Sequence, residues 1–250
     1  MNIFLSGATG KMGQMLTDLA KNSDKYEIVA GFAAELDEAS AYPIYLDLHE
    51  CQEVNQIDVI IDFSSADSLT PLLEFALQHK IPIVIASTGF THKQETQIRE
   101  AAQRIPVLHA KNMSLGVNVM QVLVEDLAAM LPEFDIEIVE KHHRYKVDSP
   151  SGTAKMLYES ANKGREDKLV ALEGRAGIYD GRKTNEVGIS SLRGGTIVGE
   201  HSVIFAGEDE VIEVKHISNS RAVFANGALK AAEFIVKQAA GFYDMNDVLK

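Results

Sequence analysis

Apolar residues in the first 110 positions form short runs that are separated by helix-like segments. The runs predict buried strands at 2–6, 27–32, 57–65, 81–86 and 106–110. Between the runs, apolar positions recur three and four residues apart, which predicts helices that run to Ala20 and over 68–79 and 93–104. Strands that alternate with helices in this way indicate an α/β fold with a Rossmann-like, doubly wound parallel sheet.

The pattern changes after residue 110. A long apolar helix is predicted from 112 to about 130, followed by a strand at 135–140 and a helix at 154–165. Seven glycines interrupt the interval 166–200, whose weak periodicity predicts loops that join strands of a mixed sheet. Residues 201–206 and 210–216 then predict a hairpin around Gly207-Glu208-Asp209, and 224–240 predicts a final helix.

These elements predict two domains. We expect the final helix to return to the first sheet, so that a discontinuous dinucleotide-binding domain comprises 1–113 and 221–250. The segment 114–220 is predicted to form an α+β domain around the mixed sheet.

Composition narrows the classes of function. The 250 residues are 46% apolar and carry a formal net charge of -12, which disfavours general nucleic-acid binding because phosphate contacts need cationic side chains. No apolar run approaches the roughly 20 residues of a membrane helix. We recognise no signal peptide before the first strand. With Cys51 as the single cysteine, no internal disulfide can form, so we expect a cytoplasmic protein.

Glycines mark the turn between the first strand and the first helix, in the segment Gly7-Ala8-Thr9-Gly10-Lys11-Met12-Gly13. Gly7 can form the tight turn, Gly10 lets the backbone approach a pyrophosphate, and Gly13 permits close packing of the helix on the strand. Because a helix N-terminus attracts anions, the turn predicts a dinucleotide site. The alternative is a tight strand–helix turn that binds no ligand.

An acidic residue after the second strand is the expected partner of the ribose of a dinucleotide. Glu35 is the first candidate and Asp37 the second, although either could be a solvated loop acid. A 2′-phosphate would need a cation instead. Lys11 could supply one, whereas Leu36 cannot.

Small polar residues follow the later strands of the first domain. The carboxyl ends of parallel strands share one edge of a sheet, so these residues are expected beside the glycine turn. Each of them alone could be only a helix cap or a turn former. They are Ser64, Ser87, Thr88, Gly89 and Asn112.

Cationic residues and hydroxyls are concentrated between 140 and 153. His142, His143, Arg144 and Lys146 fall within five positions of an otherwise acidic chain. Ser151-Gly152-Thr153 follows Pro150 at a predicted helix start, where backbone N–H groups are open to an anion. The segment therefore predicts a site for a small dicarboxylate.

The same segment contains groups that can move protons. A hydride delivered to a C=N or C=C bond leaves negative charge that needs a proton, and His142 or Lys146 could supply it. Alternatively, the histidine is structural and the lysine is solvated. A metal site is disfavoured, because adjacent histidines beside two cations suit a divalent ion badly.

Residues 140–154 closely resemble the E-x-H-H-x-x-K-x-D-x-P-S-G-T-A signature of the dihydrodipicolinate reductase family. Residues 7–13 are similar to the G-x-x-G-[RK]-M-G turn of that family. The resemblance spans nearly the whole chain. The other similar stretches are Asp62-Phe63-Ser64, Thr88-Gly89-Phe90, 112–118, 193–201, Ser220-Arg221 and 224–228.

The resemblance implies an enzyme of lysine and diaminopimelate biosynthesis that reduces 4-hydroxy-tetrahydrodipicolinate with NADH or NADPH and loss of water. It implies that His142 is a proton donor or acceptor and that Lys146 is a proton donor. It also implies a homotetramer built through the sheet of 114–220, the substrate-binding and oligomerisation domain. The implied substrate contacts are His143, Gly152 and Thr153. The implied cofactor contacts are Gly7, Ala8, Thr9, Gly10, Lys11, Met12, Glu35, Ala86, Ser87, Thr88, Ala110, Lys111, Asn112 and Met113.

Two positions depart from the family pattern. Tyr145 stands where many members have a third histidine, which puts the role of that position in doubt. Leu36 stands where some members have an arginine after the ribose-binding acid. We therefore predict that NADH is used at least as well as NADPH, with Lys11 as the remaining partner for a 2′-phosphate.

Two other functions are compatible with the glycine turn. An atypical short-chain dehydrogenase would need Tyr-x-x-x-Lys on a helix, and Tyr179 and Lys183 have this spacing in a stretch with poor helical pattern. A non-catalytic NAD(P)-sensing regulator would explain the first half of the chain. It would leave the cationic segment unexplained.

Overall fold

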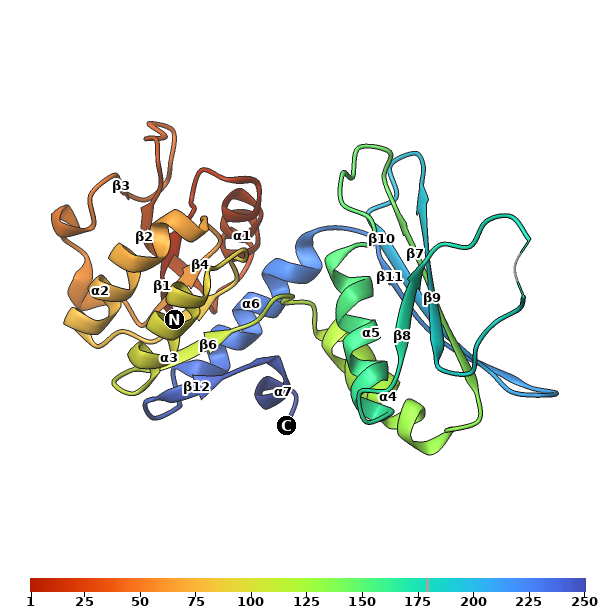
Figure 1. Cartoon of the computed structure of the whole chain (residues 1–250). Helices are drawn as coiled ribbons and strands as arrows, with labels where there is room; N and C mark the ends of the chain where they lie inside the picture. Colours follow the sequence, from red (N-terminus) through yellow and green to blue (C-terminus); the bar gives the residue numbers. More distant parts are fainter. Residues whose placement is uncertain (179) are drawn as a thin grey trace. The chain divides into compact units, whose positions relative to one another are not determined.

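The computed structural model describes residues 1–178 and 180–250. The chain divides into two compact units, each described below by itself (Figure 1). The first unit comprises Met1–Leu115 with Arg221–Lys250, and the second unit comprises Gly116–Ser220.

The first unit is built on a seven-stranded sheet in which every pair of neighbouring strands is parallel. The chain starts in the middle of this sheet and builds outward in both directions, so the order reverses beside the first strand. That reversal is where ligands bind in open α/β sheets. In sheet order the strands are β12 (Gly241–Tyr243), β6 (Pro106–His109), β5 (Ile83–Ile85), β4 (Val59–Asp62), β1 (Asn2–Ser6), β2 (Glu27–Phe32) and β3 (Ile44–Tyr45).

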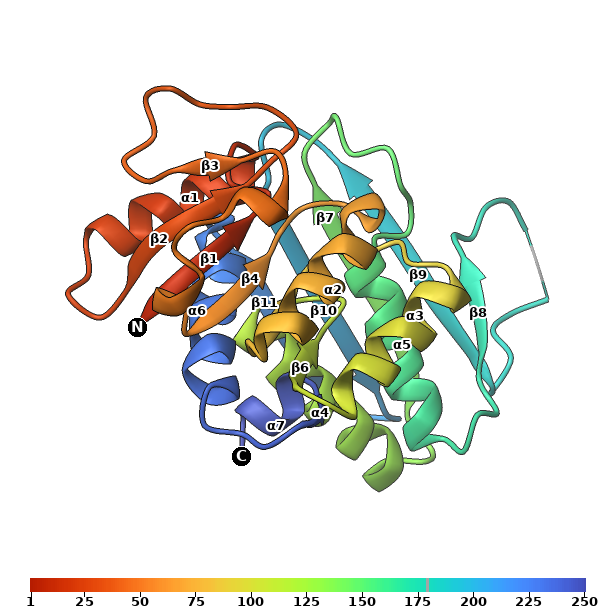
Figure 2. The same cartoon turned by 90° about the vertical axis from the view of Figure 1, so that its left-hand side faces the viewer.

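Helices cover both faces of this sheet because successive strand residues point to opposite sides. In β1, Ile3 and Leu5 join the core beneath α1 (Lys11–Lys21) and α6 (Ala222–Ile235), whereas Phe4 joins the core on the other face. There α2 (Leu69–His79) and α3 (His92–Ala102) lie side by side (Figures 1 and 2). The predicted doubly wound sheet is confirmed. The short elements are η1 (Leu48–Glu50), η2 (Val54–Gln56), η3 (Ala66–Ser68) and α7 (Met245–Val248).

The second unit contains the predicted mixed sheet. β10 pairs antiparallel with β7 and β11, while β7, β9 and β8 are mutually parallel. α4 (Leu115–Met130) and α5 (Gly152–Gly164) contribute to a core with the inward residues of the sheet, such as Ile138 and Phe205. In sheet order the strands are β11 (Val211–Ser218), β10 (Gly199–Ala206), β7 (Asp135–His142), β9 (Glu186–Arg193) and β8 (Val170–Glu173).

Several element boundaries differ from the sequence-based prediction. β7 continues through His142, two residues beyond the predicted end, because its backbone pairs with β9 and β10 even where its side chains become charged. α6 ends at Ile235 instead of residue 240, and β12 then adds an edge strand beside β6 that was not predicted. The three residues of β12 follow directly on the helical pattern and carry too little periodicity to be recognised from sequence, whereas the equally short β5 lies in a longer apolar run.

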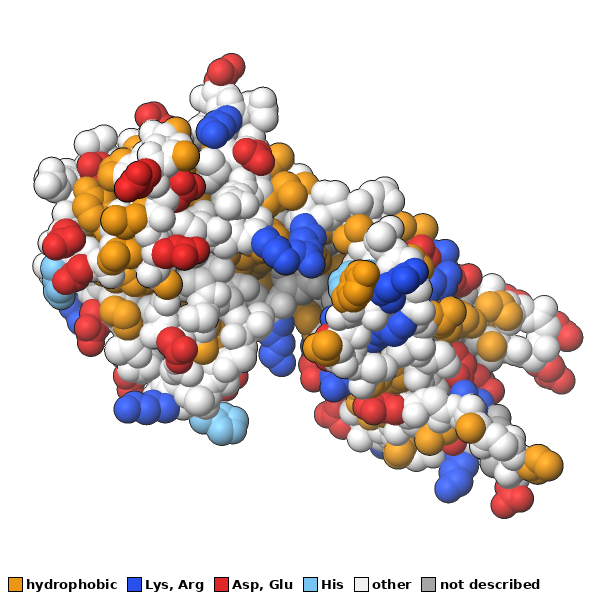
Figure 3. Space-filling model, turned by 90° about the horizontal axis from the view of Figure 1, so that it is seen from above, with side chains coloured by type: hydrophobic (Ala, Val, Ile, Leu, Met, Phe, Trp, Pro, Cys, Tyr) orange, Lys and Arg blue, Asp and Glu red, His pale blue; other side chains and the backbone are white. Residues whose placement is uncertain are grey.

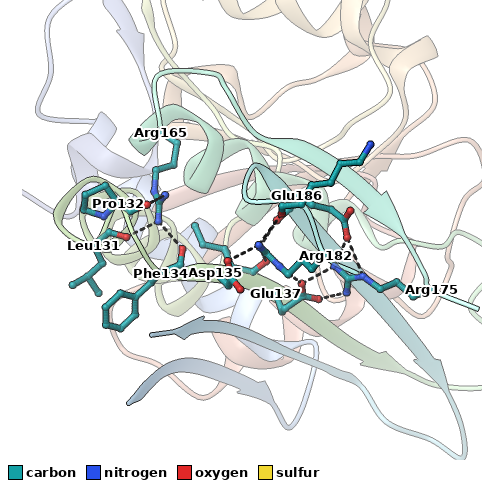
Figure 4. Close-up of polar contacts among 11 residues, drawn as sticks. Leu131, Pro132, Phe134, Asp135, Glu137, Arg165, Arg175, Arg182 and Glu186 are labelled. Atoms are coloured by element: carbon teal, nitrogen blue, oxygen red, sulfur yellow. Dashed lines mark hydrogen bonds and ion pairs between the residues drawn. The ribbon is translucent and has the colours of Figure 1, made fainter. Parts of the chain in front are cut away.

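Arginine side chains tie the ends of elements together in the second unit (Figure 4). Arg165 donates to the carbonyl oxygen of Ala128 in the last turn of α4 and to those of Leu131, Pro132 and Phe134 in the segment that follows the helix. The guanidinium of Arg175 binds Glu137 of β7 through two parallel hydrogen bonds. These charge-assisted contacts anchor the connections around the sheet.

No helix among residues 1–178 and 180–250 is both long and apolar enough to cross a membrane. On the face shown in Figure 3, acidic side chains are spread over each unit with lysines and arginines among them.

Candidate active site

The glycine turn of the first unit has the geometry that only glycine allows. Gly7 has φ +80°, and a Cβ on it would lie 2.7 Å from the carbonyl carbon of Phe63. A Cβ on Gly13 would lie 2.3 Å from the carbonyl oxygen of Gly7. The turn thus brings backbone against backbone, which leaves no room for side chains.

The N-terminus of α1 is open to an anion. Gly10 is its N-cap residue, no side chain caps it, and its first turn contains no acidic residue. The first N–H groups of a helix have no helical partner, so here they can bind a phosphate. The residues present therefore fit a dinucleotide.

The other predicted cofactor contacts lie at or just beyond the carboxyl ends of β2, β5 and β6. Glu35 is exposed after β2, and Thr88 and Lys111 are exposed after β5 and β6. Ala86, Ala110 and Asn112 are half-buried. The first unit therefore gathers the predicted cofactor residues along one edge of its sheet.

Two of these residues have structural contacts as well. The Ser87 hydroxyl donates to Asp62, a fully buried carboxylate that also accepts from the backbone N–H and the hydroxyl of Ser64. Met113 is buried in the core, where a Cβ on Gly227 of α6 would fall 1.7 Å from its carbonyl oxygen. Asp62 was not among the predicted site residues, although it begins a recognised motif.

The cationic segment of the second unit starts inside the sheet. His142 is the last residue of β7, and alternation along the strand places it on the buried face together with Glu140. The ring Nδ1 of His142 lies 2.6 Å from Oε2 of Glu140. The guanidinium of Arg193 from β9 donates to both oxygens of that carboxylate, each at 2.8 Å.

The segment ends at the N-terminus of α5. Ser151 is the N-cap residue: its Oγ accepts from the N–H of Ala154 and lies 2.9 Å from Nε2 of the buried His201. The first turn of α5 contains no acidic residue, and nothing lies within 4 Å of a Cβ built on Gly152. This helix start can therefore receive a carboxylate.

Between these two ends, Lys146 forms an ion pair with Asp148 at 2.8 Å and remains partly exposed. His143 is half-buried, with no hydrogen-bond partner at its Nδ1 among the described residues. Tyr145 is 77% exposed, and its ring centre lies 6.4 Å from that of His143. Nothing in the structure explains the choice of tyrosine at this position.

Burial and the neighbouring charges set the protonation states. Burial by itself raises the pKa of Glu140, but hydrogen bonds, led by those from Arg193 and His142, outweigh it and lower the pKa to about 2. Burial lowers the pKa of His142 from its ordinary value, and two neighbouring cations add to this although the Glu140 carboxylate opposes it. At pH 7 the pair therefore consists of an ionised Glu140 and a neutral His142.

The Glu140 pKa predicts an acid-dependent loss of stability. A carboxyl whose pKa falls on folding stabilises the protein above its ordinary pKa of about 4.5, and this contribution is lost as the pH falls towards 2. It amounts to roughly 3 kcal/mol. As the pH falls from 4.5 towards 2, we expect the free energy of unfolding, measured by urea denaturation, to decrease by about 3 kcal/mol more in the wild type than in Glu140→Gln. An equal pH dependence of stability in the two proteins would contradict the lowered pKa of Glu140.

Four residues of this cluster were missing from the predicted site: Glu140, Ser151, Arg193 and His201. All four lie in the recognised motifs, but only the sheet brings Arg193 and His201 to residues about 50 positions away in the chain. Among the described residues, no group of three or more His, Cys, Asp or Glu side chains could bind a metal ion.

The structure does not support the alternative hypothesis of a short-chain dehydrogenase. Tyr179 lies outside the described residues, and Lys183 precedes β9 without belonging to a helix. Lys183 therefore does not supply the lysine of a helical Tyr-x-x-x-Lys pair.

An open α/β sheet with a dinucleotide turn, joined to a second unit with a histidine, a lysine and an open helix start, defines a nicotinamide-dependent oxidoreductase. The comparisons identify the family within that class. The chain belongs to the dihydrodipicolinate reductase family: the N-terminal part of the family matches residues 1–113, and the C-terminal part matches residues 116–249.

Relatives match over their full lengths. The 4-hydroxy-tetrahydrodipicolinate reductase of Clostridium novyi is 45% identical over 249 residues, covering 99% of this chain and 98% of the relative. That of Caldanaerobacter subterraneus is 45% identical over 250 residues, covering 100% of this chain and 98% of the relative. A dipicolinate-bound dihydrodipicolinate reductase from Paenisporosarcina has the same fold, with a TM-score of 0.84 at 22% identity and coverage of 100% and 99% of the two chains.

Proposed function

We propose that this chain reduces 4-hydroxy-tetrahydrodipicolinate to tetrahydrodipicolinate, with NADH or NADPH and loss of water, in lysine and diaminopimelate biosynthesis in the cytoplasm. The observation that carries this proposal is the geometry at residues 140–153. There a carboxylate-bound His142 and a lysine lie in one segment with the open N-terminus of α5. The full-length relatives named for this activity support the same substrate.

In this proposal the first unit binds the cofactor. The N–H groups at the start of α1 bind the pyrophosphate, because the glycine turn admits it and no side chain competes. Glu35 binds the ribose. The bound nicotinamide supplies the hydride.

The second unit binds the substrate. One carboxylate of the dicarboxylate occupies the start of α5 at Gly152 and Thr153, where the helix dipole favours negative charge. His143 contacts the substrate beside it, and Lys146 adds positive charge. An exposed helix start next to cations selects an anion over a neutral ring.

Proton transfers complete the reaction. Lys146 carries protons on an ammonium group paired with Asp148, so we assign it the donation to the substrate after hydride arrival. His142 is neutral and hydrogen-bonded through Nδ1, so its Nε2 is suited to accept a proton and return it. Loss of the substrate hydroxyl as water is an elimination: the leaving hydroxide takes up a proton while the neighbouring carbon releases one, so this step consumes no net proton, and His142 can accept and return it.

Turnover assays test the proposed activity. Oxidation of the cofactor, followed by absorbance, is expected only when freshly prepared 4-hydroxy-tetrahydrodipicolinate is present. Cofactor binding without turnover would contradict the enzyme and favour the NAD(P)-sensing regulator.

Cofactor preference is a second test. Leu36 is 61% exposed beside Glu35 and gives a 2′-phosphate no cation, so we expect kcat/KM with NADH to equal or exceed that with NADPH. Leu36→Arg should raise kcat/KM for NADPH selectively, since arginine binds phosphate through a planar fork. A matched Leu46→Arg change, also at an exposed leucine, should not alter the ratio. Strong NADPH preference in the wild type would contradict this prediction.

A homotetramer is proposed as the assembled form. Exposed apolar side chains on strands of the second sheet, Val170, Leu192, Val211 and Ile217, support burial against other copies. Sedimentation should then give four times the chain mass of 27.4 kDa. A monomer would contradict the assembly.

A further inference from the structure

We propose that Glu140, clamped by Arg193, is a positioning residue that fixes the tautomer and the orientation of the His142 ring. The effect on catalysis rests on the proposed function, whereas the effect on the histidine itself does not. Neither Glu140 nor Arg193 is one of the groups to which the proposed function assigns substrate, cofactor or proton transfer.

The carboxylate of Glu140 is saturated with donors. Its Oε1 accepts from the N–H of Ser151 at 3.1 Å and from Arg193 at 2.8 Å. Its Oε2 accepts from Arg193 at 2.8 Å and contacts Nδ1 of His142 at 2.6 Å. The side chain has no exposed surface, and these four contacts come from three residues on β7, on β9 and at the N-cap of α5, so the carboxylate is held in one orientation.

This arrangement decides which nitrogen of His142 carries the proton. An ionised carboxylate only accepts hydrogen bonds, so Nδ1 must donate and the neutral ring must leave Nε2 without a proton. Nε2 is the nitrogen on the far side of the ring from Glu140. A Cβ on Gly199 would lie only 3.2 Å from it, so a side chain at this position would crowd the nitrogen.

Neighbouring aromatic and polar groups hold the ring plane. The ring of His201 on β10 meets that of His142 edge to face, with centroids 5.2 Å apart. His201 is itself held by Ser151, whose N–H binds Glu140. The same N-cap residue therefore connects both histidines to the start of α5.

Arg193 extends the clamp to the loop that carries the lysine. Besides Glu140, its guanidinium donates to the carbonyl oxygen of Asp148 at 2.7 Å. Asp148 in turn forms the ion pair with Lys146. A single guanidinium thus joins the supports of both proton-handling groups.

The charges that face His142 come from four directions. Glu140 on its own strand favours the protonated ring, whereas Arg193 on β9 and Lys146 in the loop oppose it. His201 on β10, with His216 beyond it on β11, is buried and neutral at pH 7. Asp148 is engaged by Lys146. Removing the Glu140 charge therefore leaves only influences that disfavour protonation of His142.

The experiment compares Glu140→Gln, Arg193→Lys and Glu200→Gln in the full-length protein. Glu200 is the matched control, because it lies on the adjacent strand β10 but binds Lys141 and Lys215 instead of His142. The titration of His142 is followed by NMR of histidines labelled at Cε1, with the His142→Gln variant to identify its signal. Turnover and cofactor affinity are measured in parallel.

We expect Glu140→Gln to move the His142 titration to lower pH and to reduce kcat by about 10- to 100-fold, with the cofactor Kd unchanged. The pH profile of kcat should shift in the same direction. Arg193→Lys retains the positive charge but loses the fork that holds Glu140, so kcat should fall by less than in Glu140→Gln, and the His142 titration should move to higher pH because Arg193 opposes protonation of that ring. Glu200→Gln should titrate and turn over as the wild type does.

An unchanged His142 titration in Glu140→Gln would overturn the inference. If Glu140→Gln does not fold, the inference is overturned when His142 in Arg193→Lys has the same titration and the same tautomer as in the wild type. If the wild-type protein does not turn over the dicarboxylate but the expected NMR shift is observed in the variant, the proposed function is overturned and the positioning role remains.

Discussion

Replacing Lys146 by methionine, or His142 by glutamine, is expected to lower kcat by roughly 10²- to 10⁴-fold, the range of general acid–base catalysis. Both changes remove a group that can carry a proton while leaving a side chain of similar size. The cofactor Kd should stay close to the wild-type value, because the proposed cofactor residues belong to the first unit and these two residues to the second.

Matched variants separate this effect from a general loss of charge. Lys168 forms an exposed ion pair with Glu166 in the second unit, so Lys168→Met removes a lysine without touching the proposed site. His92 is fully exposed on α3 and serves as the control for His142 when changed to glutamine. Wild-type turnover in both Lys146→Met and His142→Gln would rule out the proton-handling pair.

Gly13→Ala is expected to destabilise the first unit and to abolish tight cofactor binding. The added Cβ would lie 2.3 Å from the carbonyl oxygen of Gly7 and 2.5 Å from that of Ala8, and both are backbone atoms that cannot rotate away. Overpacking of this kind costs about 1–3 kcal/mol, which lowers Tm by several degrees in a protein of this size. The displaced turn would also move the N–H groups that we assign to the pyrophosphate.

Gly10→Ala provides the comparison within the same turn. Its added Cβ meets only the carbonyl oxygen of Gly7, at 3.2 Å, so Tm should change little. Cofactor affinity should nevertheless fall, because the methyl group lies where the backbone is expected to approach the pyrophosphate. Calorimetry for Tm and fluorescence titration with NADH measure the two effects. A Gly13→Ala variant with wild-type Tm and Kd would contradict the role given to this glycine.

Local sequence pattern was sufficient for five of the seven strands of the first unit. Short apolar runs separated by helical periods predicted a parallel sheet, since that alternation leaves few other arrangements. The tight turn followed from three glycines, and the close backbone contacts of Gly7 and Gly13 in the structure show why these two positions tolerate no side chain. The resemblance of residues 140–154 identified the family, which the comparisons confirm.

Long-range pairing could not be derived in the same way. The edge strand β12 was missed, and α6 was extended past Ile235, because three-residue strands and helix ends have weak local signals. The cofactor contact of Met113 stays a prediction, and the structure adds that its side chain is part of the buried core. A motif shows which residues recur together, without showing which way each side chain points.

The sequence by itself determined the fold class, the dinucleotide turn and the segment that holds a histidine, a lysine and a helix start, because each depends on residues close together in the chain. Only the tertiary structure revealed that Glu140 and His142 share the buried face of β7. The side chains alternate between the two faces up to His142 because the strand continues that far between β9 and β10. It also brought Arg193 onto Glu140 and His201 onto Ser151 from about 50 residues away. The protonation of His142 depends on these distant partners, which are brought to it by the pairing of β7 with β9 and β10.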